Sequence, residues 1–274
     1  MTCCGGLDVD PHTAVGSRLA APWILAALIL MSGCAASPQR SPLAAWSPSK
    51  NHDARQATII VLHHTQMASF DEALATLKSA NDQGRVSAHY LVAEDGRIVQ
   101  LVDERARAWH AGIGRWGALT DLNDASIGIE LDNDGTEPFA EAQVAALIRL
   151  LDDVCTRLAI PRTAVIAHAD LAPTRKADPS VHFPWARLAE AGFGEWPRPD
   201  ALPAPEGFDP VLALALLGYD TSNLPAALAA FRRRFRGMDT GPTPVGSDEG
   251  AVPVAFDDED RRILFDLQQQ RLGR

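Results

Sequence analysis

The chain has 274 residues, which is enough for one large domain or two modest ones. Its hydrophobic fraction of 46% is ordinary for a globular protein, so a sizeable core is expected. The formal net charge of −10 argues against a nucleic-acid partner, because binding a phosphate backbone needs a basic surface. A neutral or zwitterionic polymer stays open as a substrate.

The N-terminal segment has the pattern of a signal peptide. Residues 19–31 are nearly all apolar but too few for an ordinary membrane span, Arg18 precedes them and two small residues follow. Cys34 comes next, so LMSGC resembles a lipobox, which predicts a lipoprotein signal peptide over residues 1–33 and lipidation of Cys34. A plain secretory signal with an incidental cysteine is the alternative. Ala35, in place of aspartate, suggests by resemblance an outer-membrane lipoprotein facing the periplasm, anchored to the membrane by its lipid.

An α/β domain is predicted over residues 51–200, after a Ser-, Pro- and Ala-rich tether over residues 34–50. Apolar or β-branched runs predict strands at Thr58–Leu62, Ser87–Val92, Arg97–Val102, Ser126–Leu131 and Ala164–Ala167. Helical spacing predicts helices at Ser69–Ala80, with Ser69 as N-cap, and at Thr136–Leu158, where Cys155 falls on the apolar stripe. The expected fold is a mixed central sheet flanked by helices.

The C-terminal part differs in character. A proline-rich linker is predicted at residues 201–209, and a small three-helix domain at residues 210–274. The helices are expected at Pro210–Leu217, Leu224–Arg236 and Asp257–Leu272. The second helix has an apolar stripe on one face and an arginine cluster on the other, and we expect that cluster to be solvated. Its arginines are Arg232, Arg233, Arg234 and Arg236.

Polar side chains follow three of the predicted strands. The stretch IAHADLAPTRKADP carries His168, Lys176 and Asp178 after one strand, and His63 and Glu130 lie at the ends of two others. His and Asp are acceptable zinc ligands, and a catalytic zinc usually takes three protein ligands and leaves a fourth position for water. Adjacent strand residues point to opposite faces, so His64 is the alternative to His63 and not an addition to it. Asp170 is the alternative to Asp178, although bracing the loop is the more natural role for Asp170.

Five segments resemble, in order, the zinc-dependent N-acetylmuramoyl-L-alanine amidase family, and most of all its outer-membrane lipoprotein members. They are VSAHYLV, IVQLV, AWHAG, LNDASIGIEL and HADLAPTRKADP. The resemblance implies that Zn²⁺ is held by His63, His168 and Asp178. It implies that Glu130 is the general base and that Lys176 stabilises the oxyanion. The implied reaction is hydrolysis of the bond between muramic or anhydro-muramic acid and L-alanine in peptidoglycan.

The strands expected at Ser87–Val92 and Arg97–Val102 are joined by AEDG, which predicts a hairpin. The Gly-rich loop that follows, Trp109–Asp124, supplies candidate substrate contacts. Trp109 could stack on sugar or peptide, and Arg115 and Asn123 could hold a stem-peptide carboxylate. His110 is a further candidate here and a poor fourth ligand. The C-terminal helices resemble a peptidoglycan-binding domain, and a monomer is expected. Two alternatives are a non-catalytic peptidoglycan receptor and a cytosolic recycling amidase, the latter opposed by the leader and Cys34.

Overall fold

The structure is a computed structural model that describes residues 41–55, 57–79, 84–239 and 255–273. The predicted signal peptide and the lipidation site Cys34 lie outside the described residues. All described residues belong to one compact unit. Within them, no helix has the length and apolar character needed to cross a membrane.

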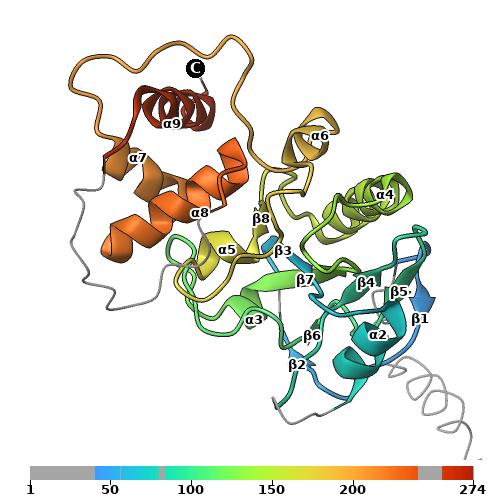
Figure 1. Ribbon diagram of the computed structural model, residues 1–274. Helices are drawn as coiled ribbons and strands as arrows, with labels where there is room; N and C mark the ends of the chain where they lie inside the picture. The colour runs from blue at the N-terminus through green and yellow to red at the C-terminus, as the bar shows by residue number, and fades with distance from the viewer. Residues whose placement is uncertain (1–40, 56, 80–83, 240–254, 274) are drawn as a thin grey trace, which may run out of the picture. The chain divides into compact units, whose positions relative to one another are not determined.

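A six-stranded mixed sheet forms the centre, in the order β1-β5-β4-β7-β3-β8 (Figure 1). Its strands are β1 (Ala45–Trp46), β3 (Ile59–His64), β4 (Tyr90–Val92), β5 (Ile98–Gln100), β7 (Ser126–Leu131) and β8 (Val165–Ala167). Neighbouring strands are parallel except β4 and β5, which form the predicted antiparallel hairpin. A separate antiparallel pair joins β2 (Asp53–Ala54) to β6 (Ala106–Arg107). The predicted α/β fold with a mixed sheet is confirmed.

Residues 41–50, which fall within the predicted tether, run along the edge of the sheet. β1 pairs in parallel with β5, and the backbone N–H groups of Ser47 and Ser49 donate to the carbonyls of Gln100 and Leu101 at 2.8 and 2.5 Å. Ser41 and Ser49 are buried. This segment therefore covers the edge strand β5, whose backbone groups would otherwise be unpaired.

Helices cover both faces of the sheet (Figure 1). The long helix α4 (Glu141–Leu158) packs on one face, where its apolar stripe, including Cys155, is buried. On the other face α2 (Phe70–Lys78) covers β4 and β5, and Ser69 caps it as predicted by accepting from the Glu72 N–H. Three short helices are α3 (Leu122–Ala125), α5 (His168–Leu171) and α6 (Trp185–Glu190).

The predicted start of α4 at Thr136 is wrong by five residues. The Asp134 carboxylate accepts from the backbone N–H and the hydroxyl of Thr136, which holds this residue in a turn. Phe139 is buried beside Phe183, with ring centroids 5.1 Å apart. The helix begins at Glu141, two residues after Phe139.

The C-terminal helices lie close to the predicted bounds. They are α7 (Pro210–Leu217), α8 (Leu224–Arg236) and α9 (Asp258–Arg271), with a 3₁₀ turn, η1 (Thr221–Asn223), before α8. Apolar residues from all three helices, among them Leu214, Phe231 and Leu264, form their own core.

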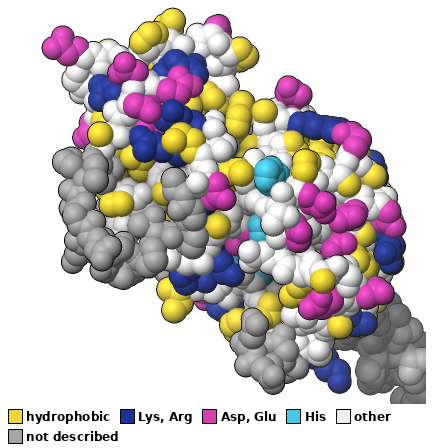
Figure 2. All heavy atoms as spheres, in the orientation of Figure 1, with side chains coloured by type: hydrophobic (Ala, Val, Ile, Leu, Met, Phe, Trp, Pro, Cys, Tyr) yellow, Lys and Arg dark blue, Asp and Glu magenta, His cyan; other side chains and the backbone are white. Residues whose placement is uncertain are grey.

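The expectation of a solvated arginine face on α8 is wrong. Arg233 and Arg234 are only 4% and 5% exposed. Arg232 and Arg236 pair with the buried carboxylate of Asp260 at the start of α9. On the surface of this part, basic and acidic side chains are interspersed (Figure 2). Arg234 pairs with Asp170 in α5 and Arg233 with Asp239 just after α8, and the spacing of residues in α8 does not reveal these partners.

Candidate metal centre and its cavity

The ends of β3 and β7 deliver two candidate residues to one face of the sheet. The strands are parallel and in register, so His63 lies opposite Glu130. Because side chains alternate along a strand, His63 shares the face of Val61, whereas Leu62 packs beneath α4. His64 is turned away, and its Nδ1 accepts from the Ser180 N–H at 3.1 Å. His63, and not its neighbour, therefore joins the metal-ligand cluster.

Three potential ligand atoms converge at this face. The Nδ1 atoms of His63 and His168 and the Oδ2 atom of Asp178 lie 3.0 Å from one another in all three pairings. His168 begins α5 directly after β8, and the following loop returns Asp178, whose carbonyl accepts from the Ala169 N–H at 2.8 Å. All three side chains are buried. In the described part of the chain they are the one group of His, Cys, Asp or Glu residues placed to hold a metal ion.

Hydrogen bonds behind His63 fix which of its nitrogens carries the proton. The Leu122 carbonyl can only accept, so the Ser126 hydroxyl donates to it and in turn accepts from His110 Nε2 at 3.3 Å. His110 Nδ1 is then an acceptor, and His63 Nε2 donates to it at 3.0 Å. The Nδ1 lone pair of His63 is left free toward the cluster, which is the tautomer that a metal ligand requires.

The orientation of His168 follows from a simpler contact. Its Nε2 donates to the Ala111 carbonyl at 2.9 Å, so its Nδ1 lone pair also faces Asp178. With both imidazole rings neutral, the three lone pairs, 3.0 Å apart, repel one another unless a cation lies between them. A tetrahedral site with bonds of roughly 2.0–2.1 Å separates its ligand atoms by roughly 3.3 Å. Donor types, tautomers and spacing therefore fit a metal cation.

The charges of the cluster favour the same conclusion. Burial, reinforced by His168, lowers the pKa of His63 to about 4, so this imidazole is neutral at physiological pH. Burial would raise the pKa of Asp178, but His168 and His63 hold it well below its usual range, so the carboxylate is ionised. A neutral His63 and an ionised Asp178 are the charge states in which these side chains bind a metal cation.

Glu130 differs from the ligands in having no partner for one oxygen. Its Oε2 is buried and accepts no hydrogen bond. Burial, and then the charge of Asp178, raise its pKa to about 8, although Lys176 opposes the shift. A buried carboxyl group with an unused oxygen and a pKa near neutrality is suited to proton transfer.

A cavity of about 900 Å³ opens over the cluster. Its wall includes the three candidate ligands and Glu130, Lys176, Trp109, His110 and Asn123. A cavity of this size is in the range of small-molecule sites.

Comparisons with known proteins identify the family. A family model described as N-acetylmuramoyl-L-alanine amidase matches residues 53–181. N-acetylmuramoyl-L-alanine amidase AmiD of Escherichia coli (strain K12) is 41% identical over 195 residues, which cover 64% of this chain and 69% of that protein. The chain belongs to the N-acetylmuramoyl-L-alanine amidase family. The predicted resemblance is thereby confirmed.

Solved structures of this amidase family match the fold over most of the chain. A complex of AmiD from E. coli with the substrate anhydro-N-acetylmuramic acid-L-Ala-D-γ-Glu-L-Lys has a TM-score of 0.65 at 34% identity, covering 86% of this chain and 94% of that one. AmpDh3 from Pseudomonas aeruginosa has a TM-score of 0.66 at 27% identity, covering 86% and 99%. Both matches extend well beyond residues 53–181, so the likeness includes the C-terminal helices.

The predicted substrate contacts of this amidase are only partly brought to the cavity. The Trp109 ring is flanked by the guanidinium groups of Arg85 and Arg107, at 5.1 and 4.6 Å from its centroid. Both nitrogens of His110 are engaged, as described above, so its contacts are with His63 and Ser126. These contacts place His110 behind a ligand as a support.

Two further residues change in standing. Asn123 Oδ1 accepts from the N–H groups of His110 and Ala111, so its oxygen shapes the loop. Arg115 is exposed, donates to the Gly117 carbonyl at 2.9 Å and does not line the cavity, so its predicted role there is not supported by its position. Arg175, which the sequence analysis missed, does line the cavity and donates to the Ala111 carbonyl at 2.9 Å. Its place beside Lys176 in the loop was the available signal.

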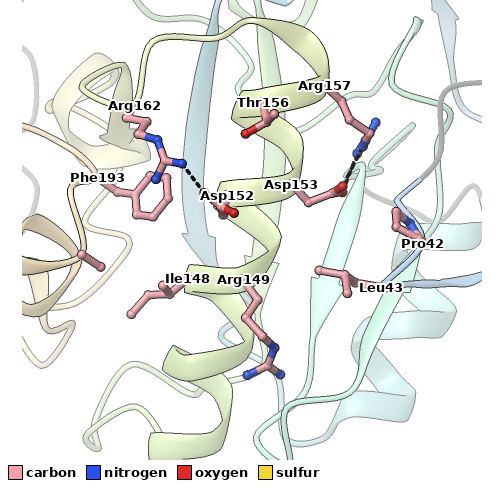
Figure 3. A pocket seen from close by; sticks show the side chains of 11 residues that line it. Pro42, Leu43, Ile148, Arg149, Asp152, Asp153, Thr156, Arg157, Arg162 and Phe193 are labelled. Carbon is pink, nitrogen blue, oxygen red and sulfur yellow. Dashed lines mark hydrogen bonds and ion pairs between the residues drawn. The ribbon is translucent and has the colours of Figure 1, made fainter.

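A second hollow of about 570 Å³ lies away from the amidase cluster, on the outer side of α4 (Figure 3). Leu43 and Phe193 form part of its wall, and Figure 3 shows the ion pair between Arg162 and Asp152 within it. A second ion pair in its wall joins Arg157 to Asp153. None of the candidate ligands or catalytic residues lines it.

Proposed function

We propose that this chain hydrolyses the amide bond between N-acetylmuramic acid, or its 1,6-anhydro form, and the L-alanine of peptidoglycan stem peptides. Cell-wall turnover or recycling is the process that such a reaction serves. The substrate named in the solved AmiD complex contains this bond. The observation that carries the proposal is the position of Glu130, which lies opposite His63 in the strand register with a buried oxygen that accepts no hydrogen bond.

The proposed metal is zinc, held by the Nδ1 atoms of His63 and His168 and by Asp178 Oδ2. When bound, zinc would acidify a water molecule and polarise the substrate carbonyl. Glu130 takes the proton from the attacking water and later gives it to the leaving amine of L-alanine. Lys176, which lines the same cavity, donates hydrogen bonds to the developing oxyanion.

Substrate binding is assigned to the polar wall of the cavity. Trp109 lines the cavity and is the aromatic side chain there that can contact a sugar or peptide. Arg175 presents a cation at the rim, suited to a stem-peptide carboxylate. His110 and Asn123 contribute by holding the loop that carries Trp109.

The proposed location is the periplasmic side of the outer membrane, with a lipid on Cys34 as the anchor. The lipobox-like LMSGC and the following Ala35 support this. Mass analysis of the protein from a membrane fraction should find an acylated N-terminal Cys34. An intact N-terminus on protein in the soluble fraction would contradict the assignment.

Mass spectrometry of muropeptides tests the activity. The purified soluble protein, supplied with zinc, should release stem peptides that begin with L-alanine and leave peptide-free glycan. Glu130→Gln, which keeps the shape of the side chain, should lower the rate by about 10²- to 10⁴-fold while zinc content stays unchanged.

Two other results would redirect the proposal. A wild-type protein that binds muropeptides but releases nothing with zinc present would be the non-catalytic receptor. Cleavage between amino acids would keep the hydrolase and move the scissile bond.

A further inference from the structure

A buried hydrogen-bonded network joins the C-terminal helices to the segment that carries the metal ligands. Its centre is Asp170, two residues after His168 in α5 and 0% exposed. Asp170 Oδ1 accepts from the Tyr219 hydroxyl at 2.7 Å. Asp170 Oδ2 accepts from Arg234 Nη1 at 2.6 Å and from the Ala167 N–H at 3.0 Å. One carboxylate therefore bonds the backbone before His168 and two side chains of the C-terminal part.

Arg234 holds the other side of the same ligand. Its guanidinium is buried, and Nη2 donates to the Val165 carbonyl in β8 at 3.1 Å. The group also lies 4.3 Å from the centroid of the Trp185 ring. Val165 precedes His168 in the chain and Asp170 follows it, so Arg234 contacts the chain on both sides of this candidate ligand.

Tyr219 also contacts the loop that carries Trp116, near the candidate metal centre. Its ring meets the Trp116 ring edge-on, with centroids 5.0 Å apart. The adjacent Gly218 has a φ of +117°, and a Cβ there would lie 2.5 Å from the Trp116 ring, so the approach requires glycine. The Gly117 N–H donates to the Gly218 carbonyl at 2.7 Å. The loop fixed in this way begins just after Ala111, whose carbonyl accepts from His168.

We propose that Tyr219 and Arg234 are positioning residues that act through Asp170 to hold His168 in its ligating orientation. The C-terminal helices are then part of the support of the metal centre and not only a wall-binding attachment. The Asp170 carboxylate bonds the N–H of Ala167, the N-cap of α5, and so fixes the backbone from which His168 projects. Metal ligands tolerate displacements of only about 0.5 Å before affinity falls.

The inference rests on the proposed function in one respect, since it concerns the zinc of that site. Its readout is Zn²⁺ affinity measured without substrate, by competition with a fluorescent chelator. Release of stem peptides plays no part in that measurement, so the two proposals can fail separately.

The chain offers matched controls. Tyr219 and Tyr90 are its only tyrosines, and each donates to a buried carboxylate, Tyr90 to Glu104 Oε1 on the α4 side of the sheet. Tyr219→Phe should weaken Zn²⁺ binding by about 10-fold, in the range seen for outer-shell partners, whereas Tyr90→Phe should leave it within about twofold. Arg234→Met should weaken binding at least as much, and Arg236→Met, on the same helix but paired with Asp260, should not.

Kinetics at saturating zinc give an independent readout, in which Tyr219→Phe lowers kcat and leaves KM unchanged. All affinities are compared at a temperature where circular dichroism shows each variant folded. If Tyr219→Phe binds Zn²⁺ as the wild type does, or loses no more affinity than Tyr90→Phe, the positioning role is overturned. Should Arg234→Met fail to fold, Tyr219→Phe decides alone, because it removes a single hydroxyl.

Discussion

Two carboxyl groups near the candidate metal centre, Glu130 and Asp170, have opposite surroundings in the fold. Glu130 in the cavity has an oxygen with no partner and a pKa raised to about 8. Asp170, at the joint with the C-terminal helices, receives hydrogen bonds on both oxygens, including one from a buried guanidinium. The Asp170 carboxylate thus receives hydrogen bonds from the protein in place of water, whereas Glu130 Oε2 receives none.

The difference is consistent with the proposed roles, in which Glu130 transfers protons and Asp170 supports the structure. A buried carboxylate that accepts hydrogen bonds on both oxygens is held in one position and stabilises the groups that it contacts. A buried carboxyl group without a partner costs free energy in the resting protein and gains a partner only when water, substrate or metal is present. The cavity thus contains an unpaired polar atom, whereas the contact between α5 and α8 pairs both oxygens of its carboxylate.

Removing a candidate metal ligand should give the largest effect, and it should fall on activity and on stabilisation by zinc. His168→Ala takes away a ligand, so we expect amidase activity to fall by more than about 10⁴-fold, or roughly 5.5 kcal/mol. Added Zn²⁺ should no longer raise the melting temperature, whereas at 100 times its Kd it should stabilise the wild type by about 2.7 kcal/mol. Activity assays and calorimetry of the variant, beside chelator-treated wild type, check both. Zinc-dependent activity in the variant would mean that the ligand set is wrong.

Breaking the ion pair between Asp170 and Arg234 should mainly lower the free energy of unfolding. Asp170→Asn leaves the Arg234 guanidinium buried without its counter-ion, and we expect unfolding in urea to require about 3–5 kcal/mol less. Asp266→Asn is the control, because Asp266 is also buried but pairs with Arg198, which is half exposed. It should cost less. Equal losses for the two variants would show that burial of the arginine is not what matters at Asp170.

The raised pKa of Glu130 predicts that the stability of the metal-free protein falls as pH rises. Because the pKa of Glu130 is raised from 4.5 to about 8, the metal-free folded protein binds a proton that the unfolded chain releases between these values. The wild type should therefore lose stability as pH rises through that window. Glu130→Gln should be more stable than the wild type by roughly 1–3 kcal/mol at pH 9 and equal to it at pH 4. Denaturation of zinc-free protein at both pH values measures this, and a variant that is less stable at pH 9 would contradict it.

The two regions also differ in how far the sequence predicts them. Apolar strands that end in His63 and Glu130 place both residues correctly, because strand alternation is a local rule. The joint is not local, since Tyr219 and Arg234 are 49 and 64 residues from Asp170. In the sequence, a buried arginine looks the same as a solvated one. Only the packed structure shows that α8 turns one arginine toward α5 and another toward α9.

The position of a loop side chain is also hard to predict from sequence, as Arg115 shows. Its substitution is expected to have the smallest effect of those considered. Its backbone N–H donates to the Leu171 carbonyl at 2.8 Å, which ties the loop to α5, but its side chain is exposed and lies outside the cavity wall. Arg115→Ala should therefore change KM for a muropeptide by less than about twofold, or roughly 0.4 kcal/mol. Arg175→Ala, which removes a guanidinium from the wall, should raise KM severalfold in the same assay. A larger KM change for Arg115→Ala than for Arg175→Ala would mean that the loop carrying Arg115 moves over the substrate. The ring contact between Tyr219 and Trp116 would then hold this loop less firmly than proposed.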